Sequence, residues 1–429
     1  MRFVVRRRFA AALMLITVAA LTLRVIYTVT ATTRPETSFY DWIFYRGEAR
    51  ALAHGDGFVL PGMFGEARDD APPVASHPPL LPILLAPVSW ISGDGGLDDS
   101  DMALRIFNCV LGAFGVALIG LLGRELNGDR TGLVAAGIAA VYPNLWVNDG
   151  LIMPESLAVV LTVAAVLLAV RAARHTTLAR AAALGVVCGL GALARGELVL
   201  LFPVLCVPAL IAGSKRSARR ALKPLLVALL VVVAVVGPWI AYNLSRFEKP
   251  VFISTNFDLN LLNSSCPRTF HGRFIGALWY CDVPHVREGS DESVFASSAR
   301  KRALSYIRAD WPQYPVVVLA RVGRTWSLFH PFDSARLGVV EGRPRWVSQL
   351  GLVFYYPLLV LAVAGAGLRR RRRAVVWPLL VPPVIVTATM LVSYGSVRYR
   401  ATAEPMLVVL AAVWLTARTG RARDVASAA

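Results

Sequence analysis

Long apolar blocks separated by short charged connections make up most of the chain. Within each block the apolar residues follow one another instead of recurring at amphipathic spacing, which is typical of helices that cross a bilayer. We therefore predict an all-α integral membrane fold with about ten transmembrane helices in a single domain, residues 1–429. The predicted spans are 9–30, 102–123, 132–148, 154–170, 180–194, 197–213, 224–242, 351–368, 375–393 and 401–417.

Clusters of positive charge follow alternate spans, and short loops rich in Lys and Arg stay in the cytoplasm. Both termini are then cytoplasmic. Two long loops, 31–101 and 243–350, lie on the extracytoplasmic side of the plasma membrane and carry juxtamembrane helices. The clusters are Arg6 to Arg8, Arg124 with Arg130, Arg171 with Arg174 and Arg180, the segment 214–223, Arg369 to Arg373, and Arg418 with Arg421 and Arg423.

Two further apolar segments are not counted as spans. Counting 78–93 would place five consecutive arginines outside, and this short segment carries four prolines, so we predict a re-entrant or interfacial segment. The stretch 315–332 is interrupted by Arg321 and Arg324. It fits a basic amphipathic helix at the membrane interface.

Composition supports the same class. The chain is 56% apolar and only 17% charged, whereas a soluble domain has about a quarter charged residues. The net charge of +18 comes mostly from arginines that flank apolar blocks, where they set orientation and meet anionic lipid headgroups. We therefore predict membrane lipid and not nucleic acid as a partner. No clean cleavage site follows the first block, so we interpret it as a retained span.

The five cysteines fall into two sets. Cys109, Cys188 and Cys206 lie in apolar blocks, where a lone thiol behaves as a small hydrophobic group. Cys266 and Cys281 lie in the long loop 243–350 with 14 residues between them. In an oxidising compartment they should pair, which stabilises a protein by about 3 kcal/mol for a loop of this size. Metal binding is the rival interpretation, although no His/Cys cluster has zinc spacing.

Candidate chemistry begins in the first long loop. Asp41 stands among aromatic residues such as Tyr45, where a partly desolvated carboxylate can accept a proton. A helix cap or a solvated charge is the alternative. His77 precedes two prolines that fix its backbone. It could bind a metal, a phosphate or a substrate hydroxyl, or only anchor the turn.

Further polar groups recur at the same predicted membrane face. Asp149 and Glu155 follow the third span, and Glu155 stands after a proline, where a carboxylate complements the helix dipole. Arg195 and Glu197 occupy a tight outer turn and could simply pair with each other. Asp41, His77 and Glu155 are thus expected at one face, as a lipid-substrate enzyme requires.

Arg398 and Arg400 stand at another outer end of a span, in the stretch 394–405. The planar guanidinium fork of each suits a phosphate. Snorkelling to lipid headgroups is the competing account.

Together these residues resemble the C-type glycosyltransferases, polytopic enzymes that use polyprenyl-phosphate sugars. The nearest likeness is to bacterial relatives of the protein O-mannosyltransferases and of the lipid A aminoarabinose transferases. The resemblance covers most of the chain in order. It rests on Asp41 with Tyr45, Ala49, Leu52, Gly55, Gly57 and Phe58; His77 to Leu80; Arg105 and the segment 123–126; the stretch 142–155; and the stretch 398–405.

The resemblance implies that Asp41 is the catalytic base. It would take a proton from the acceptor hydroxyl, and the sugar would transfer with inversion as polyprenyl phosphate leaves. Arg398, Arg400 and Arg195 would bind the phosphate, with Tyr45 as a further donor contact. A divalent metal is an open cofactor, with His77 and Glu155 as metal or donor contacts.

The chain also departs from the protein O-mannosyltransferases, which have two adjacent acids where Asp41 is followed by Trp42. The acceptor therefore stays open between a cell-envelope glycan, a lipid and a protein. The stretch around Cys266 resembles actinobacterial members, in which we expect the paired cysteines to order a loop that covers the substrate. These members imply decaprenyl-phosphate mannose or arabinose as donor.

Two other functions remain as alternatives. A lipid transporter would show repeats and charges near the bilayer midplane, whereas the sequence shows no convincing repeat and few charges within the spans. A polymerase or ligase of lipid-linked glycans would share the fold and the compartment but use a pyrophosphate-linked donor.

Overall fold

The structure is a computed structural model that describes residues 2–31, 41–60, 71–93, 99–215, 217–282, 285 and 289–426. Over these residues the chain is helical, with one isolated β-bridge between Val59 and Pro73. This confirms the all-α class. Parts of the predicted loop 31–101 (32–40, 61–70 and 94–98) and Arg216 lie outside the described residues, as do the side chains of Arg6, Arg418, Arg421 and Arg423.

Within the described part, six helical segments are long and apolar enough to cross a membrane. One of them, 196–213, is a composite of 3-10, π and α turns that carries two prolines. The six are α1 (Arg2–Ala31), α4 (Asp99–Asn127), α7 (Glu155–Arg174), η1 (Gly196–Leu200) with η2 (Phe202–Cys206) and α9 (Val207–Gly213), α10 (Ala218–Arg246), and α16 (Arg345–Arg371).

Every predicted span coincides with a helix, but the count of ten is not confirmed, because the remaining apolar helices are shorter. The predicted span 132–148, for example, is divided between two helices. Pro143 lacks an N–H and Tyr142 before it is extended, so α5 stops at Val141. The other apolar helices are α3 (Leu80–Ser92), α5 (Asp129–Val141), α6 (Pro143–Trp146), α8 (Leu178–Ala194), α17 (Trp377–Thr389) and α18 (Glu404–Ala426), whose apolar part is 404–417.

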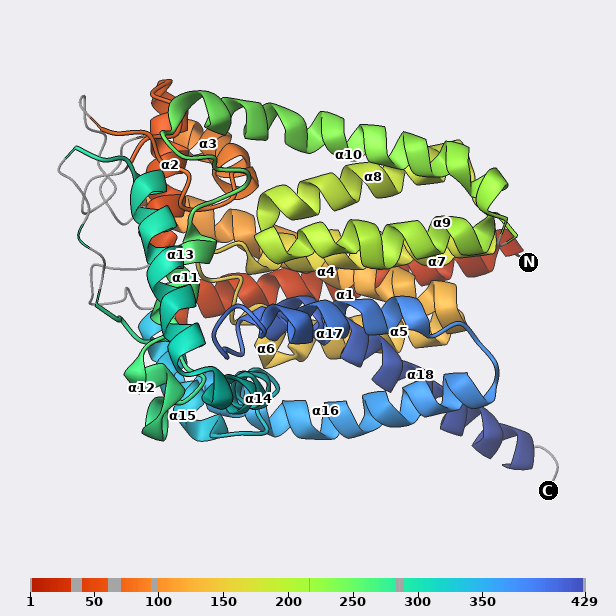
Figure 1. The fold of residues 1–429 in the computed structure, drawn as a ribbon. Coiled ribbons are helices and arrows are strands. Elements are labelled where there is room, and N and C mark those ends of the chain that lie inside the picture. The colour runs from red at the N-terminus through yellow and green to blue at the C-terminus, as the bar shows by residue number, and fades with distance from the viewer. Residues whose placement is uncertain are drawn as a thin grey trace.

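Helix α3 occupies the segment predicted to be re-entrant or interfacial. It has 13 residues with Pro87 inside, so it reaches about 20 Å, less than the roughly 30 Å of a bilayer core. In Figure 1 it lies beside α2 (Asp41–His54) at one end of the bundle, which agrees with the prediction.

The long loop 243–350 supplies most of the remaining helices. They gather at the same end as α2 and α3, whereas α1 begins and α18 ends at the opposite end (Figure 1). The loop helices are α11 (Asn256–Asn263), α12 (Pro267–Phe270), η3 (Gly272–Phe274), α13 (Glu292–Ala309), η4 (Trp311–Gln313), α14 (Tyr314–Thr325), α15 (Pro331–Leu337) and η5 (Gly338–Glu341).

Burial places α7 at the centre of the bundle. Of its apolar window 78% is buried, against 22% for α1 and 17% for α10, so the last two form the periphery. Small residues let neighbouring helices come close, as in other membrane bundles. At Gly365 of α16, an added Cβ would lie 2.0 Å from the Leu410 carbonyl oxygen of α18.

Cys266 and Cys281 form the expected disulfide. The neighbouring prediction for 315–332 needs a correction: α14 is present, but its arginines do not face an interface. Arg321 and Arg324 are 0% and 1% exposed. Arg321 donates to the Ser264 carbonyl, at 2.6 Å. Arg324 donates to the carbonyls of Ile275 and Arg273, at 2.6 and 2.7 Å. Loop carbonyls in and beside the disulfide ring need donors, and the two guanidinium groups supply them.

We predict that Gly365→Ala destabilises the protein, whereas Gly367→Ala does not. The new methyl group at 365 overlaps the Leu410 carbonyl, and such overpacking costs about 1–3 kcal/mol. At 367, in the same helix, nothing lies within 4 Å of an added Cβ, and alanine favours the helix. Thermal unfolding in detergent should show a lower midpoint for the first variant only; equal midpoints would refute the close α16–α18 contact.

Candidate active site

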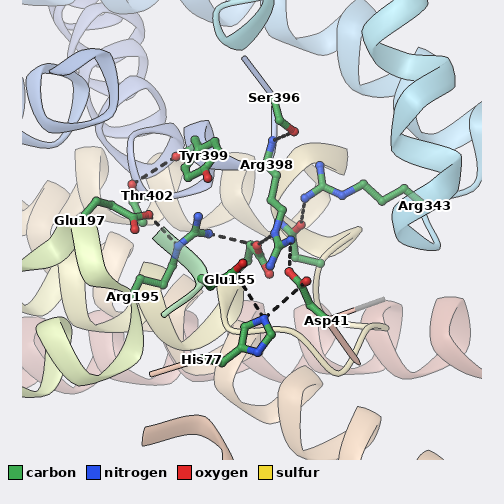
Figure 2. A network of polar contacts seen from close by, with 12 residues as sticks. Asp41, His77, Glu155, Arg195, Glu197, Arg343, Ser396, Arg398, Tyr399 and Thr402 are labelled. Atoms are coloured by element: carbon green, nitrogen blue, oxygen red, sulfur yellow. Dashed lines mark hydrogen bonds and ion pairs between the residues drawn. The ribbon is translucent and has the colours of Figure 1, made fainter. Parts of the chain in front are cut away.

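Asp41 begins α2 and turns its carboxylate toward residues from distant parts of the chain (Figure 2). Its Oδ2 lies 2.5 Å from Nη1 of Arg398, and its Oδ1 lies 3.4 Å from Nε2 of His77. The side chain remains 31% exposed. It is thus the most accessible carboxylate of the cluster while both of its oxygens face a nitrogen.

His77 is held on several sides. Its ring packs on Tyr45 and Phe44, with centroids 4.7 and 5.3 Å away, and its side chain is 5% exposed. Nε2 also faces the Asn256 amide nitrogen at 3.3 Å. Among the described residues, Nδ1 has no hydrogen-bond partner. The prediction of a rigid histidine therefore agrees with its packing, and Tyr45 serves here as the surface under the ring.

Glu155 is the first residue of α7 and is buried. Its Oε1 accepts from Nε of Arg398 and, at 3.0 Å, from Nη1 of Arg195. Arg195, at the end of α8, also pairs with Glu197 at 2.7 Å. The expected neighbour pair is therefore one part of a larger network that joins α2, α7, α8 and the segment before η6 (Tyr399–Thr402).

Arg343 was missed from the sequence. It is buried at 6% exposure, donates to Oδ1 of Asn148 at 2.8 Å, and points toward Arg398 and Asp41 in Figure 2. It is one of many arginines in the loop 243–350, so no local pattern distinguishes it. Asn256 was also missed, because its part in the site depends on contact with a segment 179 positions away.

Neighbouring side chains determine the pKa of the Asp41 carboxyl. Burial raises the pKa of its carboxyl, but Arg398 and His77 outweigh this and hold the pKa well below its usual range. Asp41 as a proton acceptor therefore stays a prediction, and the contact with Arg398 lowers the basicity of its carboxylate.

Two predicted residues lie outside this network. Arg400 is 1% exposed, pairs with Glu404 at 2.5 Å, and lies 3.6 Å from the ring centroid of Tyr355. Asp149 is buried and pairs with Arg24 of α1 at 2.6 Å, so it is not at an outer surface as expected. The buried charge of each residue is paired with an opposite charge inside the bundle.

The chain is similar to a known protein family and to solved structures. Residues 76–242 match the model of a family described as dolichyl-phosphate-mannose-protein mannosyltransferase. The oligosaccharyltransferase AglB from Archaeoglobus fulgidus, solved with an inhibitory peptide and a dolichol-phosphate, matches with a TM-score of 0.58. The identity is 15%, and the match covers 99% of this chain and 52% of that one. The resemblance to C-type glycosyltransferases is confirmed.

A second structure, ArnT from Cupriavidus metallidurans bound to undecaprenyl phosphate, matches at 12% identity with a TM-score of 0.44. That match covers 96% of this chain and 79% of that one. No curated protein sequence gives a significant match. This chain spans about half the length of the archaeal oligosaccharyltransferase that it matches.

The residues of the site do not fit the metal contacts predicted for them. No group of three or more His, Cys, Asp or Glu side chains that could hold a metal occurs in the described part of the chain. The Glu155 oxygen that faces the site already contacts two guanidinium groups, which repel a cation. One structure of the Archaeoglobus fulgidus oligosaccharyltransferase is a complex with Zn and sulfate.

We predict that Glu155→Gln lowers the unfolding midpoint of the protein more than Glu197→Gln does. The first change leaves two buried arginines without their shared counter-charge, and breaking a buried pair costs about 3–5 kcal/mol. Glu197 is 12% exposed and, among the ion pairs of the described residues, pairs with Arg195 alone. Thermal unfolding in detergent compares the two variants, and equal shifts would argue against Glu155 as the centre of the network.

Proposed function

We propose that this membrane protein transfers a sugar from a polyprenyl-phosphate donor to an extracytoplasmic acceptor hydroxyl, with inversion. The observation that carries the proposal is the network of Asp41, Arg398, Glu155 and Arg195 at the end of the bundle where the long loops gather. It places a partly accessible carboxylate beside arginines whose donors match a phosphate. A transporter would not need this pairing of a base with an anion site.

Asp41 is the proposed base. Its carboxylate takes the proton of the acceptor hydroxyl while that oxygen forms a bond to the anomeric carbon. The bond from this carbon to the phosphate oxygen breaks, and the electron pair leaves with polyprenyl phosphate. Arg398 and Arg195 stabilise the negative charge that develops on the leaving phosphate.

Donor binding would also make Asp41 a better base. Arg398 holds the pKa of Asp41 below its usual range through a 2.5 Å contact. A phosphate competes for the same guanidinium and brings its own negative charge near Asp41. Both effects raise the pKa of the carboxyl, so proton transfer becomes favourable only when the donor is present, while His77 still orients Oδ1.

The proposal also includes the side of the membrane on which the reaction occurs, the donor and the acceptor. The active site faces the extracytoplasmic side of the plasma membrane and both termini face the cytoplasm, since they lie at the opposite end from the site (Figure 1). The described parts of the loops 31–101 and 243–350 gather at the same end of the bundle as the site (Figure 1). Mannose and arabinose on decaprenyl phosphate are the donors to test first, with an envelope glycan, lipid or protein as acceptor.

We predict that Asp41→Asn abolishes release of free polyprenyl phosphate from a labelled donor in proteoliposomes that contain a crude envelope acceptor. The asparagine keeps the size of the side chain but cannot take the proton. Asp56→Asn, an exposed acid after α2, is the matched control and should keep the wild-type rate. The donor panel includes pyrophosphate-linked glycans. Release from these alone would indicate a polymerase or ligase, and no release from any donor by folded protein would refute the transferase.

We further predict that Arg398→Lys and Arg400→Lys fail in different ways. Loss of the guanidinium fork at 398 should reduce release by about 10²-fold, the size of effect seen when one oxyanion donor is removed. At 400 the same change removes contacts to Glu404 and Ser327, so the unfolding midpoint should fall instead. A normal midpoint with a lost phosphate affinity in Arg400→Lys would return Arg400 to the phosphate site.

A further inference from the structure

The segment that carries His77 is held by the first turn of α13, more than 200 positions away. The backbone N–H of Ala75 donates to Oε1 of Glu292. The Thr255 hydroxyl donates to the same oxygen at 3.3 Å. One carboxylate oxygen therefore joins the first long loop to the beginning of the second.

The two joined segments also contact each other and converge on His77. The Thr255 N–H donates to the Ala75 carbonyl at 2.9 Å, and the Asn256 N–H donates to the Ser76 carbonyl at 3.2 Å. The Asn256 amide then faces Nε2 of His77 at 3.3 Å. Glu292 is thus connected to His77 from both sides through hydrogen bonds of the neighbouring backbone.

A second side chain, Arg246, holds the same stretch of backbone as Glu292. Arg246, from the end of α10, donates to the carbonyls of Phe58 and Val74, each at 2.7 Å, so it fixes the same backbone one residue earlier. Glu48 of α2 is fully buried. Burial raises the pKa of Glu292 to about 7 and that of Glu48 well above its ordinary value.

We propose that Glu292 is a positioning residue for the transfer reaction: it sets the backbone of Ala75 and Thr255, and so holds His77 and Asn256 in place beside Asp41. This inference rests on the proposed function. His77 stands 3.4 Å from Oδ1 of Asp41, and a displacement of about 1 Å at a reacting group can cost about 10²-fold in rate. Glu292 touches neither the reacting atoms nor the arginines of the phosphate site.

The test is a double-mutant cycle on release of polyprenyl phosphate. Glu292→Ala should lower kcat by about 10-fold or more and leave the KM for the donor within about twofold, because the phosphate-binding arginines belong to other elements. Glu292→Gln keeps an acceptor oxygen and should restore most of kcat. In a His77→Ala background, Glu292→Ala should have no further effect, since its route to Asp41 is already lost.

The matched control is Asp310→Ala. Asp310 is an acid at the other end of α13 that pairs with His271 at 2.7 Å, so its loss loosens the helix without touching the His77 segment. Its kcat should stay within about twofold of wild type. An equal loss in Asp310→Ala, or a Glu292→Ala effect that multiplies with that of His77→Ala, would overturn the positioning role.

Failure of the proposed function has a different signature, namely that wild type itself releases no polyprenyl phosphate. Wild type, Glu292→Ala, His77→Ala and the double variant are then compared by their unfolding midpoints. If Glu292 holds His77, the midpoint shifts of Glu292→Ala and His77→Ala should be less than additive. Additive shifts would show that the two residues are independent and would refute the contact path.

Discussion

The guanidinium of Arg398, shared between Asp41 and Glu155, is the contact on which the site depends. It draws the first long loop and the start of α7 onto the segment before η6, three parts of the chain that are far apart in sequence. Buried charges are costly unless they are paired, so Arg398 and its acids can be buried only together. The same pairing suppresses the basicity of Asp41, and a bound phosphate is what would relieve it.

The loop closed by the Cys266–Cys281 disulfide contacts the segment that carries Arg398. Gly395, three positions before Arg398, donates its N–H to the Gly276 carbonyl inside the disulfide ring at 2.8 Å. Both glycines lie against the backbone of Arg321 so closely that an added Cβ would be 2.7 Å from its nitrogen at 276 and 2.5 Å from its oxygen at 395. A loop expected to cover the substrate therefore also holds the arginine segment against α14.

The buried arginines have three different kinds of partner, and the partner decides what each arginine does. Arg398 lies beside a partly exposed acid. Arg400 and Arg24 are 1% exposed with matching acids, so they fix helices to one another. Arg321 and Arg324 satisfy loop carbonyls. Of these arginines, Arg398 is the one whose acidic partner is 31% exposed.

The sequence by itself determined the membrane class, the helical blocks, the disulfide and the set containing Asp41, His77, Glu155, Arg195 and Arg398. Apolar blocks and charged ends are local properties, and residues at the same end of neighbouring spans must lie near one another. Only the tertiary structure decided which way each arginine points, that Arg400 and Asp149 leave the site, and that Arg343, Asn256 and Glu292 join or support it. These outcomes depend on side-chain direction and on contacts between segments far apart in sequence, and neither is encoded in the local pattern of polar and apolar residues.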